Sequence, residues 1–175
     1  MNKIIIKSSS IVKWLIVANI ILFTVSWTMS VVAYPKLPSK IPTHFNLGGK
    51  PDTWKAKSLL SFLIFPIVQT IFVIAFFLFA LFSKNISFPK KEILSFLSKD
   101  KRKVIYSLLQ EFIFLVLIFF NLLFIHLQRS VILTAHKLVS GIDKYYFYSI
   151  IGIIFMLIFL YFFKIKFKVK ELLIS

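Results

Sequence analysis

The sequence predicts an all-α integral membrane protein with four transmembrane helices and both termini in the cytoplasm. Of its 175 residues, 59% are hydrophobic and 16% are charged, whereas a soluble domain is about 45–50% apolar and about 25% charged. Four apolar stretches are each long enough to cross about 30 Å of hydrocarbon as a helix. They occupy residues 11–34, 59–82, 104–127 and 145–163. The chain is therefore expected to form two helix pairs, in residues 1–85 and 86–175.

The distribution of Lys and Arg predicts how the spans are oriented. Residues 1–13, residues 83–103 and the tail after Phe163 together carry 14 of these cations, and the two other connections carry eight. Because cytoplasmic loops are enriched in Lys and Arg, the termini are expected inside. Residues 35–58 and 128–144 are then expected outside.

The composition also excludes several classes of function. The formal net charge is +16, but the lysines flank apolar segments rather than gathering on a polar domain, so no nucleic-acid partner is expected. The sequence has no cysteine, which removes disulfides, thiolate metal sites and cysteine nucleophiles. We expect no cofactor, no bound metal, and the lipid bilayer as a constant partner.

Polar residues in the first two spans predict contacts between helices. Asn19, Ser26 and Ser30 recur at spacings of seven and four residues, which places them on one helix face where a neighbouring helix can approach closely. Pro66 in the second span has no amide N–H and therefore leaves a carbonyl oxygen free. Gln69 or a neighbouring helix is expected to donate a hydrogen bond to that carbonyl.

The third span holds the most polar side chains inside the predicted membrane region. Gln110, Asn121 and Gln128 are separated by 11 and then 7 residues, so they share nearly the same helix face. Such a stripe could line a ligand path, but hydrogen bonding between helices is the commoner use, and we favour it. Glu111, near the inner end, is expected to reach the interface or to meet a lysine.

The basic connection between the second and third spans has two interpretations. From residue 88 to residue 101, apolar side chains alternate with lysines in a helix-like pattern. The pattern is typical of a short interfacial helix on anionic lipid. It also fits an ordinary basic loop that follows the positive-inside rule.

The connection in residues 35–58 differs in composition from the rest of the chain. It holds four of the six prolines. Proline fixes φ and favours extended geometry in the residue before it, so the loop is expected to be ordered. The segment from Asn46 to Gly49 predicts a turn, and Pro51-Asp52 predicts the start of another.

This ordered loop is expected to present polar and aromatic side chains outside the membrane. The candidate binding residues are His44, Asn46, Asp52, Trp54 and Lys57. Two apolar side chains of the loop are expected to turn toward the bilayer or the helix bundle. They are Leu37 and Phe45.

His44 and Asp52 leave several chemical interpretations open. They could act as a base and its orienting acid, although the sequence has no recognisable serine or cysteine nucleophile motif. As metal ligands they are two, where zinc uses three or four, unless His126 or His136 joins them. They could instead bond turn backbone and fix the shape of the loop, or recognise a partner. An enzyme is not expected.

A family resemblance becomes visible in this loop. The pattern is Tyr34-Pro-x-Leu37-Pro38-x-x-Ile41-Pro42-x-His44-Phe45-Asn46-x-x-Gly49-x-Pro51-Asp52-x-Trp54-x-x-Lys57. Over about the first 85 residues the chain resembles the bacterial membrane family called domain of unknown function 1648. That family includes the amino-terminal part of SdpI-type proteins, which protect a Bacillus-type cell from a secreted killing factor. The second half lacks the Asn-Pro and Gly-x-Arg signature of the carboxy-terminal part of those proteins.

Three hypotheses for function follow. The resemblance implies a multi-pass protein of the bacterial cytoplasmic membrane that recognises an extracytoplasmic peptide or protein, as in toxin immunity or sensing. Small size, four spans and polar stripes also suit an accessory subunit of a larger membrane transport complex, with a membrane-protein partner. The third hypothesis is a small membrane enzyme that uses His44 and Asp52.

Overall fold

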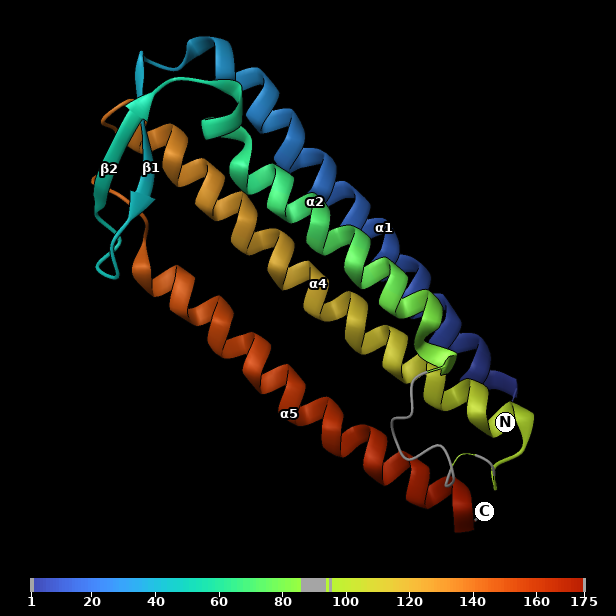
Figure 1. Cartoon of the computed structure of the whole chain (residues 1–175). Helices are drawn as coiled ribbons and strands as arrows, with labels where there is room; N and C mark the ends of the chain where they lie inside the picture. The colour runs from blue at the N-terminus through green and yellow to red at the C-terminus, as the bar shows by residue number, and fades with distance from the viewer. Residues whose placement is uncertain (1, 86–93, 95, 175) are drawn as a thin grey trace.

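Four long helices and one small β-hairpin make up the described part of the chain. The structure, a computed structural model, describes residues 2–85, 94 and 96–174. The elements are α1 (Asn2–Ala33), the 3-10 turn η1 (Tyr34–Lys36), β1 (Lys40–Phe45), β2 (Pro51–Ala56), α2 (Leu59–Leu81), the 3-10 turn η2 (Phe82–Asn85), α4 (Lys99–Ala135) and α5 (Lys144–Ile174) (Figure 1). All four long helices have the length and apolar composition of a membrane span. The predicted bundle of four membrane-length helices is confirmed, with a β-hairpin added to it.

Three helices extend well beyond their predicted spans, and α1, with 32 residues, begins nine residues before its own. α4 has 37 residues and α5 has 31, so α4 is about 55 Å long at the standard rise. Ser98 caps α4, because its side chain accepts a hydrogen bond from the amide of Lys101. Helical hydrogen bonds are internal to the segment and do not stop where lipid gives way to water. The apolar pattern therefore located the membrane-crossing part and not the helix ends.

The helices pack around α4. α1 and α2 both lie along α4, whereas α5 packs on α4 and has little direct contact with α2 (Figure 1). The most deeply buried apolar side chains lie on this central helix, among them Ile105, Ile113 and Leu117. The two predicted helix pairs therefore share one apolar core.

Both ends of the chain lie at the same end of the bundle, and the hairpin lies at the opposite end (Figure 1). Leu94 and Leu97 are buried in the core cluster at the end of the bundle near the termini. The predicted interfacial helix falls largely on residues 86–93 and 95, which lie outside the described residues, so it stays a prediction.

The connection between α1 and α2 is an antiparallel hairpin. Asn46 to Gly49 forms the predicted turn, with the Gly49 amide donating to the Asn46 carbonyl at 2.8 Å. The second predicted turn is wrong, because Pro51 begins strand β2 opposite Phe45. In a two-stranded sheet each strand is an edge, so the missing amide of a proline need not break the ladder.

Candidate functional site

The hairpin is fixed to the bundle through one face of β1. Ile41 is fully buried and Leu37 is 4% exposed. Both belong to a cluster with Phe62 of α2 and Val131 of α4, and Phe45 packs against the same cluster. The predicted inward orientation of Leu37 and Phe45 is confirmed. Strand β2 is largely exposed, so the strand that packs on the bundle is β1.

His44 and Asp52 meet on this hairpin. His44 Nδ1 lies 2.5 Å from Asp52 Oδ1, and the two side chains are 66% and 40% exposed. Irregular pairing between β1 and β2 on either side of His44 brings the residues together, because a bulge redirects side chains within a ladder. The Thr53 hydroxyl also donates to Asp52 Oδ1, at 3.3 Å.

The contact has an electrostatic consequence for the carboxyl group. The hydrogen bond from His44 is the main reason that the pKa of Asp52 lies below its ordinary value of 3.8. A carboxylate only accepts hydrogen bonds, so the hydrogen of this contact resides on Nδ1 and the other ring nitrogen remains available. The pair therefore presents an oriented imidazole at an exposed position.

The tip of the hairpin is tied to the connection between α4 and α5 and to the start of α5. The Gly49 carbonyl accepts a hydrogen bond from the Ile142 amide at 2.7 Å, and the Leu47 carbonyl accepts one from the Tyr148 hydroxyl at 3.1 Å. Gly49 has φ +79°, and a Cβ added there would lie 2.3 Å from the Ile142 carbonyl oxygen. A Cβ on Gly141 would lie 2.0 Å from the Gly49 carbonyl oxygen. Both positions therefore require glycine.

The other candidate binding residues divide into structural and exposed groups. The Asn46 Oδ1 accepts from the Lys50 amide at 3.1 Å and closes the turn. Lys57 Nζ donates to the Leu37 carbonyl at 2.9 Å and lies 5.4 Å from the centroid of the Tyr34 ring, as expected of a structural tie. Trp54 lies opposite Pro42 and is 43% exposed.

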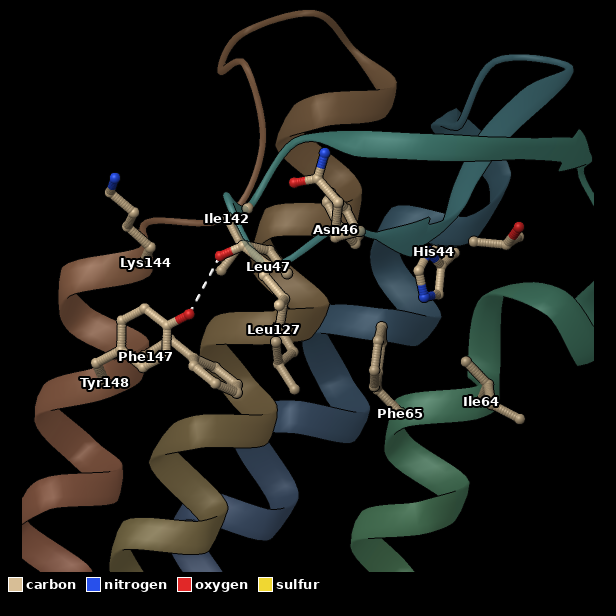
Figure 2. Close-up of a pocket in the computed structure, with 13 residues that line it drawn as sticks. His44, Asn46, Leu47, Ile64, Phe65, Leu127, Ile142, Lys144, Phe147 and Tyr148 are labelled. Carbon is tan, nitrogen blue, oxygen red and sulfur yellow. Dashed lines mark hydrogen bonds between the residues drawn. The ribbon is translucent and has the colours of Figure 1, made fainter.

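A pocket of about 430 Å³ lies beneath the hairpin. Figure 2 shows the hairpin turn above it, Ile64 and Phe65 on α2, Leu127 on α4, and Lys144, Phe147 and Tyr148 on α5. Its lining also includes His44. The sequence reasoning missed the contribution of Gly141, Ile142, Lys144 and Tyr148. A glycine in each outer connection was the available signal, but it does not say which loops meet.

The predicted stripe on the third span bonds between helices. Asn121 Nδ2 donates to Asn19 Oδ1 at 2.9 Å, and Gln69 Nε2 donates to Asn121 Oδ1 at 2.6 Å. Gln110 Nε2 donates to the Ala80 carbonyl of α2 at 3.2 Å. These side chains link α1, α2 and α4, as the favoured interpretation predicts.

Glu111 and the first-span residues also lie where the sequence predicts. Lys164 Nζ lies 3.1 Å from Glu111 Oε1, and the Tyr161 hydroxyl donates to the same oxygen at 2.6 Å. Asn19, Ser26 and Ser30 are at most 1% exposed. The predicted lysine partner and the predicted contact face of α1 are both confirmed.

Gln128 serves the carbonyl that Pro66 leaves free. In a helix the Pro66 nitrogen would face the Phe62 carbonyl four residues earlier. Gln128 Nε2 of α4 donates to that carbonyl at 3.3 Å, while Gln69 bonds Asn121 instead. The hydrogen-bond donor to this carbonyl is thus on a neighbouring helix, which was one of the two expected donors, and is not Gln69.

The described residues contain no group of three or more His, Cys, Asp or Glu side chains that could hold a metal ion. The two outer connections do touch, at Gly49 and Ile142. His126 stacks near Tyr146, with ring centroids 4.3 Å apart, and does not join His44 in such a group.

Comparisons with known proteins support the membrane-family resemblance. Residues 21–70 match the family model described as Domain of unknown function (DUF1648), a segment that contains the last 13 residues of α1, the hairpin and half of α2. An uncharacterized protein of Archaeoglobus fulgidus is 37% identical over 59 residues, which is 34% of this chain. The alignment spans 31% of that relative, or about a third of its length. No solved structure matches.

Proposed function

We propose that this multi-pass membrane protein uses its hairpin to recognise a peptide or protein partner outside the membrane. One observation carries the proposal: His44, Asp52 and Trp54 are exposed on a hairpin whose other face is anchored to the bundle. Surface that is already rigid loses little conformational entropy on binding. An exposed tryptophan is also a frequent anchor in protein interfaces.

The charge around Trp54 favours an acidic partner. Four exposed lysines lie in or beside the hairpin: Lys36, Lys40, Lys50 and Lys55. The carboxylate of the hairpin, Asp52, already contacts His44. A partner with Asp or Glu beside an apolar side chain would complement this surface in charge and in shape.

The distribution of Lys and Arg indicates on which side of the membrane the hairpin lies. The end of the bundle that holds both termini is flanked by 14 cations, against eight at the hairpin end. The positive-inside rule places the richer end in the cytoplasm. The hairpin then faces the exterior, where a secreted partner would meet it.

Toxin immunity or sensing is the finer form of the proposal. It is supported by the sequence resemblance of the hairpin region to SdpI-type proteins. It predicts that expression of this protein protects a cell sensitive to a secreted peptide, and that Trp54→Ala removes protection without lowering the amount of protein in the membrane.

A photocrosslinking experiment tests the general proposal. A benzophenone amino acid replaces Trp54, cells are irradiated, and the crosslinked species are identified by mass spectrometry. The same replacement at Trp14, which is 72% exposed on α1, is the matched control for lipid-facing reaction. We expect a peptide or protein to be linked at position 54 and absent at position 14.

Specific recognition also requires the pair beside Trp54. His44→Gln and Asp52→Asn are expected to remove the crosslink, whereas His136→Gln, at an exposed position in the second outer connection, is expected to retain it. Crosslinks only to lipid, or a product unchanged in the His44 and Asp52 variants, would contradict the proposal.

The geometry of the pair favours a second candidate function, general-base chemistry. An imidazole oriented by a carboxylate is the arrangement that activates a hydroxyl or a water. The purified protein would then convert a bound peptide or lipid, and His44→Gln would abolish product formation while leaving binding intact. If His44→Gln abolished binding as well as product formation, the result would favour recognition instead.

A further inference from the structure

Two separate pockets lie one after the other along the bundle between α2 and α5. α4 forms their floor, since α5 packs on α4 and has little contact with α2. The outer one is the pocket beneath the hairpin, of about 430 Å³. The inner one is a second pocket of about 480 Å³, lined by residues that include Ala75 and Phe76 of α2, Phe120 of α4, and Ile158 of α5. We call the two together the lateral groove.

The lateral groove is polar at one end only. Its outer pocket includes His44 and Lys144, and Figure 2 shows the Lys144 side chain rising at the start of α5. No Asp or Glu is among the described residues that line this pocket. Every residue lining the inner pocket is apolar. An occupant that complements both ends has an anionic head and a hydrocarbon tail.

The distance from the outer pocket to the inner one matches one leaflet of a bilayer. Phe65 lines the outer pocket and Phe76 the inner one, and the 11 residues between them correspond to about 16 Å of helix. Half of the hydrocarbon core is about 15 Å. A lipid chain that starts at the level of the hairpin would therefore extend into the inner pocket.

The hairpin closes the outer end of the lateral groove. Its tip is bonded to the connection before α5 through Gly49 and Ile142, and to α5 itself through Leu47 and Tyr148. A transmembrane helix of a partner, which is about 10 Å wide, would have to pass this roof to leave the membrane. A lipid of the outer leaflet ends at this depth and meets no such obstacle.

We propose that the lateral groove binds an anionic phospholipid of the outer leaflet. The headgroup phosphate pairs with Lys144 at the start of α5, beside the hairpin turn, and one acyl chain lies between α2 and α5 on the floor formed by α4. This inference shares with the proposed function only the orientation of the bundle in the membrane, because neither Lys144 nor Ala75 belongs to the hairpin surface that would meet a peptide.

Native mass spectrometry of the purified protein tests the proposal. The probes are phosphatidylglycerol and phosphatidylcholine with identical acyl chains, titrated separately. We expect phosphatidylglycerol to bind more tightly, and Lys144→Gln to weaken it by about fivefold, the effect of one lysine near an anionic lipid. Lys137→Gln removes an exposed cation of the same connection that does not line the groove and should retain the binding.

A second pair of variants tests the apolar part. Ala75→Phe fills the inner pocket and should weaken both lipids. Gly152→Phe adds the same ring to α5 at a position with no atom within 4 Å of an added Cβ, and should leave both unchanged. Circular dichroism and gel filtration verify that each variant is folded.

Four outcomes would overturn the proposal. Equal binding of the two lipids, or binding unchanged in Lys144→Gln, would mean that only ordinary surrounding lipid fills the groove. Binding unchanged in Ala75→Phe would place the lipid elsewhere. A membrane-protein subunit that co-purifies with the wild type and is lost in Ala75→Phe would make the groove a subunit interface, as in the accessory-subunit hypothesis.

Discussion

The centre of the bundle and the outer hairpin both contain hydrogen-bonded polar side chains, but in opposite surroundings. At the centre, Asn19, Gln69 and Asn121 are at most 1% exposed and bond across three helices. On the hairpin, the His44 and Asp52 side chains bond each other and remain well exposed. A buried amide that loses its partner has no water to take the partner's place. An exposed side chain on the hairpin can bond water instead. The central network therefore specifies the fold, and the hairpin pair is free to bind something else.

The largest effect is expected from breaking the central network. Asn121→Leu removes the bonds to both Asn19 and Gln69 and leaves their polar groups in an apolar surrounding. Two interhelical bonds, at roughly 1 kcal/mol each, predict a loss of about 2 kcal/mol in the free energy of unfolding. Unfolding in mixed micelles measures it. Thr24→Val, which loses only a bond to the Ile20 carbonyl of its own helix, should change it much less.

The next effect concerns Gln128 and the carbonyl left free by Pro66. Gln128→Leu should lower the free energy of unfolding by about 1 kcal/mol, because the Phe62 carbonyl loses its donor. In a Pro66→Ala background the restored amide of residue 66 can bond that carbonyl. Gln128→Leu should then lower the free energy of unfolding much less. A double-mutant cycle measures the coupling. Equal costs in both backgrounds would show that the bond does not compensate for the proline.

A smaller effect, confined to the hairpin, is expected from Gly49→Ala. The new Cβ would collide with the Ile142 carbonyl, at a positive φ that favours glycine. The tip should detach, so the Ile142 amide should exchange its hydrogen faster while global unfolding changes little. Gly48→Ala is the matched control, since its Cβ would meet only the Asn46 side chain, at 3.2 Å. Unchanged exchange at Ile142 in the Gly49 variant would contradict the tie.

The smallest effect is the response of the hairpin to pH. Because the folded hairpin lowers the pKa of Asp52 below 3.8, this carboxylate stabilises the hairpin fully above that pH. The contribution is lost as the pH falls through the lowered pKa. Chemical shifts of His44 and Thr53 should therefore report a looser hairpin only below about pH 4, and Asp52→Asn should remove that transition. A transition of the same size in the variant would assign it to another group.

The contrast between the two regions shows why the sequence predicted the centre of the bundle better than the hairpin. Asn121 and Gln128 lie on one face because helical periodicity is local, and polar groups in lipid must find partners. The place of Pro51 in a strand depends on its pairing with Phe45, a contact between strands. Local sequence does not show that contact, so Pro51 was predicted to start a turn. The meeting of Gly49 with Ile142 joins segments almost a hundred residues apart and has no local pattern to reveal it.

The sequence by itself determined four apolar helices, their polar contact faces, the turn from Asn46 to Gly49, and an ordered connection between the first two helices. Each of these follows from interactions with the solvent or between near neighbours in the chain. Only the tertiary structure decided that Gln128 bonds the Phe62 carbonyl, that the hairpin tip rests on α5, and that α5 stands away from α2 to leave the lateral groove. These depend on how helices of fixed shape pack, which side chains distant in the chain decide together.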